Sequence, residues 1–323
     1  MSIKKWDVTA LGELLIDFTQ NGTSEQGNPV FEANPGGAPC NVLAMLSKLG
    51  KKTAFIGKVG DDGFGKQLTD AVREVGICTD GLMYDREIHT TLAFVHKLPN
   101  GDRDFSFYRK PGADVNLKAD EINEELIRNS RVLHYGTLSL TDEPARSATQ
   151  KAVRIAQEAG LILSFDPNLR EPLWNSLDEA KEQVDWGLRH CDVLKISDNE
   201  ITWFTGKEDF GEGIRFLQEN YPIRLICLSM GRTGSRGCYK DLRVDVPAFL
   251  QEKTIETTGA GDTFGACVLN GVLEYGLDQL DEEKLRKILT FANAAASLVT
   301  TKKGALRVMP EKEQVEAFIK SRQ

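Results

Sequence analysis

The sequence has few of the residues that build disulfide frameworks or metal centres. Its six cysteines are scattered and contain no C-x-x-C pair, and its four histidines are equally dispersed. Such spacing argues against both a disulfide framework and a zinc site. Because most of the cysteines lie inside apolar segments, the pattern is typical of buried, reduced thiols in a cytoplasmic protein.

A surplus of basic residues and a long apolar run are also missing. The chain of 323 residues has 40 Lys and Arg against 48 Asp and Glu, which gives a net charge of −8. This balance argues against a nucleic-acid partner, since no basic surplus remains to neutralise phosphates. The longest apolar runs, such as 225–228, have only the length of a strand, and the first residues contain no apolar signal core. We therefore predict no membrane partner and a cytoplasmic location.

Segments typical of strands and helices alternate along most of the chain. Short apolar runs predict strands at 8–11, 53–59, 132–135, 161–165, 193–196 and 225–229. Helical periodicity, often followed by a glycine, predicts helices at 41–49, 64–75, 143–159, 177–189, 211–219, 263–275, 282–300 and 311–321. The alternation predicts an α/β fold, with one open, mostly parallel sheet flanked by helices in a single domain over 1–323.

Two segments interrupt this alternation and carry no predicted helix. Residues 13–33 continue past the first strand, and residues 88–110 resemble a hairpin with a turn at Asn100-Gly101. Together they predict a small β-sheet that stands off the main sheet. Such a sheet would serve as a lid over a site, as the contact surface of a homodimer, or as both.

The most informative motif is TTGAGDTF at 257–264, which an apolar run at helical spacing follows. Gly259, Ala260 and Gly261 let backbone N–H groups crowd together at a helix N-terminus, and this favours an anion. Asp262, in the same turn, would repel that anion unless it accepts a proton from an attacking hydroxyl. An anion cradle beside a carboxylate base is what phosphoryl transfer to an alcohol requires. An aspartate that caps a glycine-rich helix entry explains the octapeptide equally well.

Two motifs nearer the N-terminus are suited to binding a polyol. Gly36 and Gly37 permit close backbone approach to a ligand, and Asn41 offers a donor and an acceptor from the first turn of a helix. Asp17 follows the first strand, where ligands of open α/β sheets bind, and its carboxylate can accept two hydroxyl protons. The alternatives are an ordinary loop that leads into a helix and an exposed lid charge.

Three further motifs, at 166–170, 195–200 and 229–237, each follow a predicted strand. In the second, Glu200 suits either the water shell of Mg²⁺ or a capping box with the serine three residues earlier, and both roles can hold at once. The third is glycine-rich and suits close contact with a nucleotide, although a hairpin turn fits as well. It does not match the P-loop pattern.

With these motifs the chain resembles the PfkB/ribokinase family of carbohydrate kinases along nearly its whole length. The glycine pair before Asn41 is similar to the N-terminal signature of that family, and 259–264 is similar to its highly specific C-terminal signature. Within the family, the strings at 12–18, 107–114 and 165–174 are most similar to those of fructokinases.

The resemblance implies roles for individual residues. It implies Asp262 as the base, the amides of Gly259, Ala260 and Gly261 as the anion hole, and Asp17 and Asn41 as ligands of the sugar. We also expect Gly36 and Gly37 to bind the substrate. Arg109 from the lid and Arg170 from the core would reach sugar or phosphate. On the nucleotide side we expect Lys195, Ser229, Gly231, Gly234 and, near the adenine, Asn293.

The resemblance also implies metal ions. Glu200 would hold Mg²⁺ through water, with Ser197 where the family often has asparagine. Glu256 would lie in a site for a monovalent cation such as K⁺, at a position where many members have aspartate.

We therefore predict a kinase that uses ATP and Mg²⁺ to phosphorylate a sugar hydroxyl, foremost the 6-OH of D-fructose. Ribose, 2-keto-3-deoxygluconate and nucleosides stay open as alternatives, because sugar choice rests on a few hydroxyl contacts. A catalytically silent sugar or nucleotide sensor on the same fold also stays open. The retained Asp262 favours the enzyme over the sensor.

Overall fold

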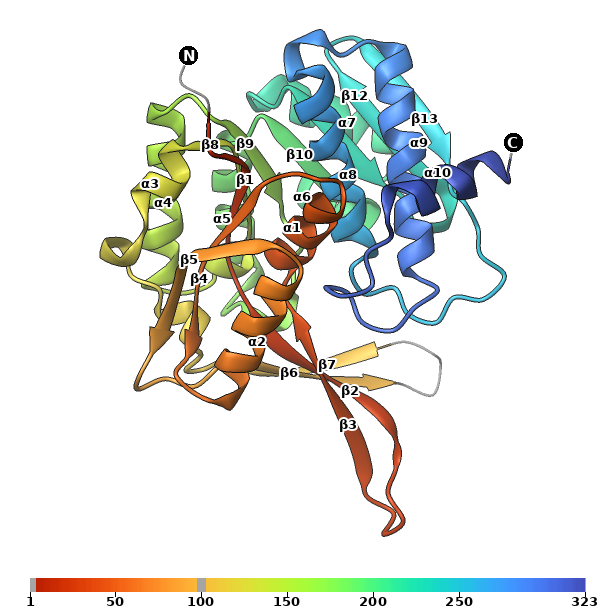
Figure 1. The fold of residues 1–323 in the computed structure, drawn as a ribbon. Helices are drawn as coiled ribbons and strands as arrows, with labels where there is room; N and C mark the ends of the chain where they lie inside the picture. The colour runs from red at the N-terminus through yellow and green to blue at the C-terminus, as the bar shows by residue number, and fades with distance from the viewer. Residues whose placement is uncertain (1–3, 98–102, 323) are drawn as a thin grey trace.

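The computed structural model describes residues 4–97 and 103–322 and contains a large and a small sheet (Figure 1). The large sheet has nine strands, in the spatial order β13 (Leu242–Pro247), β12 (Gly234–Tyr239), β11 (Leu225–Ser229), β10 (Val193–Ser197), β9 (Ile162–Asp166), β8 (Ser130–Gly136), β1 (Trp6–Leu11), β4 (Thr53–Gly60) and β5 (Ile77–Asp85). Neighbours from β11 to β5 are parallel, and β12 and β13 add an antiparallel edge. The predicted mostly parallel α/β fold is confirmed.

Helices cover both faces of the large sheet, because side chains of each buried strand point alternately to either side. Val132, for example, belongs to one buried apolar cluster and its neighbour Leu133 to the other. The first cluster lies under α1 (Ala38–Lys48), α2 (Gly63–Glu74), α8 (Ala260–Tyr275), α9 (Glu282–Val299) and α10 (Lys312–Lys320). The second lies under α3 (Glu124–Arg128), α4 (Ala145–Glu158), α5 (Leu177–Arg189), α6 (Asp198–Thr205) and α7 (Phe210–Asn220).

Short 3₁₀ helices occupy several connections: Ala113–Asn116, Ala119–Glu121, Leu138–Leu140, Glu171–Leu173, Gly231–Thr233 and Leu277–Gln279. Left-handed glycines such as Gly50 (φ 76°) and Gly160 (φ 65°) end helical runs, as predicted. Within the described residues, no helix combines the length and apolarity that crossing a membrane requires.

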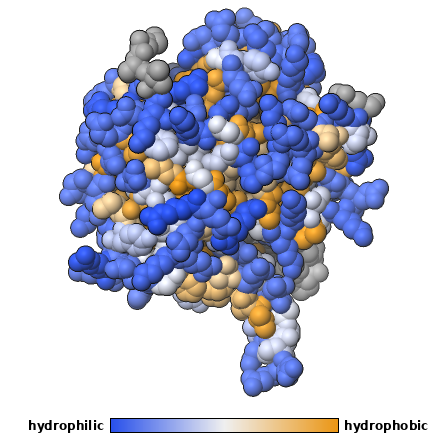
Figure 2. Space-filling view, in the orientation of Figure 1, coloured by the Kyte–Doolittle hydropathy of each residue, from blue (hydrophilic) through white to orange (hydrophobic). Residues whose placement is uncertain are grey.

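The small sheet is made by the two segments that interrupt the alternation. Its strands are ordered β3 (Pro29–Gly36), β2 (Leu15–Thr23), β6 (Leu92–Lys97) and β7 (Arg103–Tyr108). The Phe18 ring stacks on Phe94 and meets Phe64 of α2 edge-on, which ties the sheet to the body. The β2–β3 hairpin projects from the body and ends in a hydrophilic tip (Figures 1 and 2). The predicted sheet is confirmed, while the predicted Asn100-Gly101 turn lies outside the described residues.

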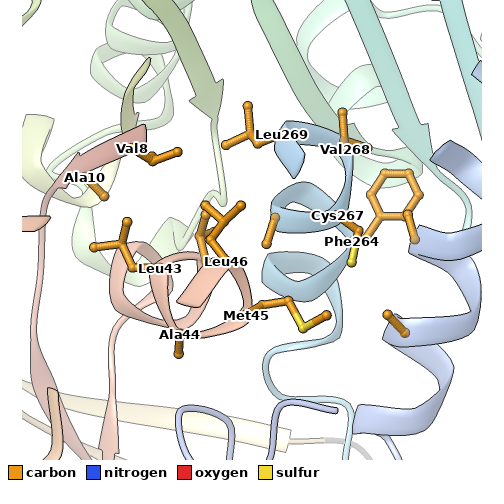
Figure 3. Close-up of a cluster of buried hydrophobic side chains, with 14 of the residues drawn as sticks. Val8, Ala10, Leu43, Ala44, Met45, Leu46, Phe264, Cys267, Val268 and Leu269 are labelled. Atoms are coloured by element: carbon orange, nitrogen blue, oxygen red, sulfur yellow. The ribbon is translucent and has the colours of Figure 1, made fainter. Parts of the chain in front are cut away.

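Helices α1 and α8 lie side by side although more than 200 residues separate them in the sequence (Figure 3). Their contact is apolar and fully buried: Leu43 and Leu46 of α1 and Val268 and Leu269 of α8 belong to one cluster. Because this packing fixes both helix axes, it also fixes the relative position of the polar residues at their N-termini.

Candidate active site

A cavity of about 1000 Å³ opens between the small sheet and the carboxyl-end edge of the large sheet. It gathers most of the predicted site residues, although they come from distant parts of the sequence. Those on its wall are Asp17, Gly37, Asn41, Arg170, Lys195, Glu200, Glu256, Gly259, Gly261 and Asp262. Gly36 adjoins this wall, since a Cβ there would come within 2.2 Å of Asp17 Oδ2. This close approach explains the need for glycine.

Asp262 and Asn41 form the centre of the site. Asn41 Nδ2 donates a 2.8 Å hydrogen bond to Asp262 Oδ2, and both side chains are more than nine-tenths buried. Burial raises the pKa of Asp262, which the Asn41 hydrogen bond and the charges of Lys195 and Arg170 partly offset. A buried carboxylate with one oxygen held and an elevated pKa has the properties of a general base.

The predicted anion cradle lies at the start of α8, where Gly259 is the N-cap with φ 77°. A Cβ on Gly259 would approach Ala305 Cβ to 2.8 Å, so both the backbone conformation and the space favour glycine. Ala260 N–H donates to the Thr257 carbonyl at 3.2 Å and is thus already used within the protein. Gly261 faces Lys195, because a Cβ there would lie 3.3 Å from Nζ. Positive charge and a helix N-terminus therefore meet at Gly261.

Lys195 forms a buried ion pair with Asp166, whose carboxylate oxygens lie 3.0 and 3.1 Å from Nζ. The pair joins the ends of adjacent parallel strands, β9 and β10. Burial lowers the pKa of Lys195, but the charges of Asp166, Glu200 and Asp262 outweigh it, so the pKa is raised and the amine stays protonated. A fixed cation therefore lies on the cavity wall beside Asp262.

Glu200 forms the capping box that was one of its two predicted roles. Its Oε2 accepts hydrogen bonds from Ser197 N and Oγ at 2.8 and 2.7 Å, and its Oε1 accepts one from Leu169 N at 2.8 Å. Burial raises the pKa of Glu200, but Lys195 and these donors lower it below its ordinary value. The carboxylate is therefore ionised, and Oε1 keeps an acceptor position that a metal-bound water can use.

Asp17 faces the same cavity from β2. Burial raises its pKa to about 7; the charge of Arg170 opposes this rise, and those of Glu256 and Asp262 reinforce it. Arg170 lies on the wall and donates to the Leu169 carbonyl at 3.0 Å. Because the Asp17 carboxylate is poorly solvated, it is suited to accept hydrogen bonds from hydroxyl groups.

Glu256 links two loops at the cavity rim. Its Oε1 accepts from Thr258 Oγ1 at 2.6 Å and its Oε2 from Gly304 N at 3.2 Å. The carboxylate thus joins the approach to α8 with the loop that follows α9.

The structure corrects the prediction for Arg109. Its side chain is only 3% exposed and lies outside the cavity wall. Nε donates to Asp114 Oδ2, Nη1 to Thr141 Oγ1 and Nη2 to the Leu138 carbonyl, at 2.8, 2.8 and 2.6 Å. Because each guanidinium nitrogen already donates to the protein, Arg109 anchors the base of the β6–β7 hairpin and does not reach sugar or phosphate in this structure.

Four residues expected on the nucleotide side lie off this wall. Ser229 pairs with Ser197 at the ends of β11 and β10, and Gly231 and Gly234 form the turn into β12. The side chain of Asn293, on α9, donates to the carbonyls of Val246 and Pro247 at 3.1 Å. Their contact with a nucleotide stays a prediction.

Two further buried acidic residues lie at or near the cavity without a role assigned from the sequence. Asp166 was visible only as an acid that directly follows a buried strand, which is the available signal for it. Glu13, between β1 and β2, lies on the cavity wall and is 4% exposed. The sequence signal for Glu13 is its acidic side chain close to Asp17 in the sequence.

Comparisons with known proteins show similarity to carbohydrate kinases over nearly the whole chain. The model of the pfkB family carbohydrate kinases matches residues 5–312. Probable fructokinase-2 of Arabidopsis thaliana is 42% identical over 97% of this chain and 95% of its own length. Fructokinase of Xylella fastidiosa with bound ATP has a TM-score of 0.89 at 29% identity and covers 98% of both chains. A double mutant of fructokinase from Vibrio cholerae O395, in its fructose, ADP and potassium ion bound form, has a TM-score of 0.87 at 29% identity, over 99% of this chain and 100% of its own.

The family match spans nearly the whole chain, and the Asp262 motif that carried the resemblance lines the cavity. This chain belongs to the pfkB family of carbohydrate kinases.

Proposed function

We propose that this protein transfers the γ-phosphoryl group of ATP to the 6-hydroxyl of D-fructose. The observation that carries this proposal is the Asn41–Asp262 pair at the start of α8, next to the buried Lys195 cation. Relatives named as fructokinases, among them one with bound ATP and one with fructose and ADP, support both substrates.

Two groups of residues have different roles in the proposed reaction. We name Glu13, Asp17 and Asn41 the sugar end, and Asp166, Lys195, Glu200 and Gly261 the phosphoryl end. Asp262 lies between them, since it accepts a hydrogen bond from Asn41 of the sugar end and directly follows Gly261 of the phosphoryl end on α8.

In the proposed reaction, Asp262 accepts the proton of the sugar hydroxyl while the oxygen of that hydroxyl forms a bond to the γ-phosphorus. The bond between the γ-phosphorus and the bridging oxygen breaks, and ADP leaves with the electron pair. Asn41 holds one oxygen of Asp262, so the other is oriented toward the hydroxyl. Lys195 and the N-terminus of α8 stabilise the charge that develops on the transferred oxygens.

Glu200 fits the outer sphere of a magnesium ion, because its charge is retained and Oε1 keeps an acceptor position. Magnesium, when bound, supplies positive charge to the phosphate oxygens. For potassium we propose the loop held by Glu256, a proposal supported by the potassium form of the Vibrio cholerae relative. Ser229, Gly231, Gly234 and Asn293 are proposed to contact the nucleotide.

We further propose that the small sheet acts as a lid and as the contact surface of a homodimer. Support comes from apolar side chains exposed on it, Val30 at 43% and Tyr108 at 65%. The six cysteines are all free thiols, which supports a cytoplasmic location.

The test is a coupled assay of ADP formation with ATP, Mg²⁺ and a panel of D-fructose, ribose, 2-keto-3-deoxygluconate and adenosine. The expected result is the highest kcat/KM for fructose, with one fructose 6-phosphate formed per ADP. A higher kcat/KM for another member of the panel would overturn the choice of fructose. ADP formation that no acceptor stimulates would overturn the kinase itself.

A further inference from the structure

Glu13 lies where the two sheets join, in the segment between β1 and β2. Its side chain is 4% exposed, yet it forms part of the cavity wall together with Asp17 and Asn41. A carboxylate in this position can stabilise the fold or bind the ligand. Its contacts show which of these roles its oxygens are free to take.

The backbone of Glu13 is held in place by a neighbouring glycine. A Cβ at Gly37 would come within 2.4 Å of the Glu13 carbonyl oxygen, so these two segments pack backbone against backbone. Glu13 Oε1 accepts a 2.8 Å hydrogen bond from Ala38 N–H, at the first residue of α1. The carboxylate therefore caps the helix that carries Asn41.

Capping uses only part of the hydrogen-bonding capacity of this carboxylate. Two ionised oxygens offer about four acceptor positions. Among the described residues, the amides of Ala38 and of Glu13 itself are the hydrogen-bond donors that lower the pKa of this group. Burial raises that pKa to about 7, and the positive charge of Arg109 opposes the rise. Acceptor positions thus remain on a buried carboxylate beside the cavity.

The neighbouring side chain of Asn41 also has an unused acceptor. Asn41 Oδ1 is buried and has no hydrogen-bond partner among the described residues, while its Nδ2 is used by Asp262. Asp17, on the same wall, is a further acceptor. Three side chains with unused acceptor positions are complementary to a ligand that presents several hydroxyl groups, and they repel a carboxylate or phosphate at this end.

We infer that Glu13 is a specificity-determining residue that accepts a hydrogen bond from a sugar hydroxyl while it caps α1. The inference rests on the proposed sugar kinase function. It adds a residue that fixes which hydroxyl pattern is accepted, and it assigns the sugar end to neutral polyols rather than sugar acids.

The variant Glu13→Gln separates the two roles of this side chain. Glutamine keeps the size and one acceptor oxygen for Ala38 N–H, but replaces the other oxygen by a donor. If Glu13 binds the sugar, KM for fructose rises about ten- to a hundredfold, the loss expected for a hydrogen bond to a charged group. KM for ATP stays within about twofold in this case, because the change lies at the sugar end.

Asp209→Asn is the matched control, since Asp209 Oδ1 also accepts a hydrogen bond at a helix N-terminus, from Glu212 N–H of α7, outside the cavity. It should leave both KM values unchanged. A series of monodeoxy fructoses adds a second readout: removal of the hydroxyl that Glu13 binds should raise KM in the wild-type protein and have little further effect in Glu13→Gln.

The outcomes are distinct. Wild-type KM for fructose in Glu13→Gln, or a Glu13→Gln protein that does not fold, would make Glu13 a structural residue and overturn the inference alone. Wild-type protein that phosphorylates no sugar of the panel would overturn the proposed function, and the inference with it. A raised fructose KM that depends on one particular hydroxyl supports both.

Discussion

The two ends of the cavity contain similar charged groups, but these groups differ in the hydrogen bonds that they receive from the protein. At the phosphoryl end, Glu200 accepts three hydrogen bonds from protein donors, and the nearby Lys195 helps to hold its pKa below the ordinary value. At the sugar end, burial raises the pKa of Asp17 and of Glu13 to about 7. Burial also raises the pKa of Asp166, at the phosphoryl end, to about 7, but Lys195 Nζ lies 3.0 Å from its Oδ2. The carboxylates of the phosphoryl end therefore have donors within the protein, whereas those of the sugar end keep acceptor positions for a ligand.

This difference follows from the elements that build each end. Lys195 lies on β10 and Glu200 in the first turn of α6, where strand pairing and helix capping supply donors nearby. Asp17 lies on β2 of the small sheet, and Glu13 lies in the segment between β1 and β2. Each prediction below acts on one end, or on the base between them, and thereby tests their separation.

The largest effect is expected at the base that both ends share. Asp262→Asn keeps the shape of the side chain and its contact with Asn41 but removes the proton acceptor, so kcat should fall by roughly 10²–10⁴-fold. Steady-state kinetics with fructose and ATP measure this loss. Asp70→Asn, at an exposed position on α2, is the control. A kcat for Asp262→Asn above about a tenth of the wild-type value would remove Asp262 from the mechanism.

The next effect is expected at the phosphoryl end. Lys195→Met removes the cation beside Gly261, and kcat should fall about 10²-fold, the scale of one lost charge-stabilising group. KM for fructose should change by less than about threefold, because the sugar end is untouched. Lys66→Met, on the exposed face of α2, serves as the control. A shift in fructose KM larger than the change in kcat would contradict the separation of the two ends.

A smaller effect is expected at the sugar end. Asp17→Ala removes an acceptor for the sugar and should raise KM for fructose about ten- to a hundredfold, since a hydrogen bond to a charged group contributes about 1.5–3 kcal/mol. KM for ATP should stay near the wild-type value. Initial rates over a matrix of both substrates give the two constants together. An Asp17→Ala protein in which only the ATP constant changes would show that the two ends are assigned the wrong way round.

The raised pKa values predict opposite pH dependences for stability and for sugar use. Since Asp17 and Glu13 hold protons up to about pH 7 when folded, and unfolded carboxyl groups release them near pH 4, the folded state binds more protons between these values. Stability of the free protein should therefore fall as pH rises from 5 to 8, while kcat/KM for fructose rises. Asp17→Asn should melt about 2 °C or more above wild type at pH 8. A lower melting temperature for Asp17→Asn at pH 8 would contradict the account.

The smallest effect is expected for the metal-facing carboxylate. Glu200→Gln keeps an acceptor for the capping box but lacks the charge that orients metal-bound water, so the Mg²⁺ concentration for half-maximal rate should rise a few-fold. Glu219→Gln, exposed on α7, is the matched control. An identical Mg²⁺ titration curve in Glu200→Gln would leave Glu200 with its capping role alone.

Much of the fold was predictable from local patterns, because amphipathic helices and buried parallel strands have distinct periodicities. The helix Leu177–Arg189 and the strand Leu225–Ser229 have the predicted bounds. The antiparallel edge strands β12 and β13 were missed, since the glycine-rich segment 229–237, which overlaps β12, is also typical of a loop.

The site was predictable where its residues are adjacent in the sequence and form one motif, as around Asp262. It was not predictable where the direction of a long side chain decides the role. Arg109 turns toward Asp114 and the Leu138 carbonyl, and Asp166 meets Lys195, 29 residues away, because β9 and β10 are neighbours. Such pairings depend on tertiary structure rather than on spacing.

The most direct test of the two-ended site is the binding of fructose without ATP, measured by isothermal titration calorimetry on three proteins. Wild type and Lys195→Met should bind fructose with dissociation constants within about threefold of each other, whereas Asp17→Ala should bind at least tenfold more weakly. Equal weakening in Lys195→Met and Asp17→Ala would contradict the account, because it would mean that the sugar contacts both ends of the cavity alike.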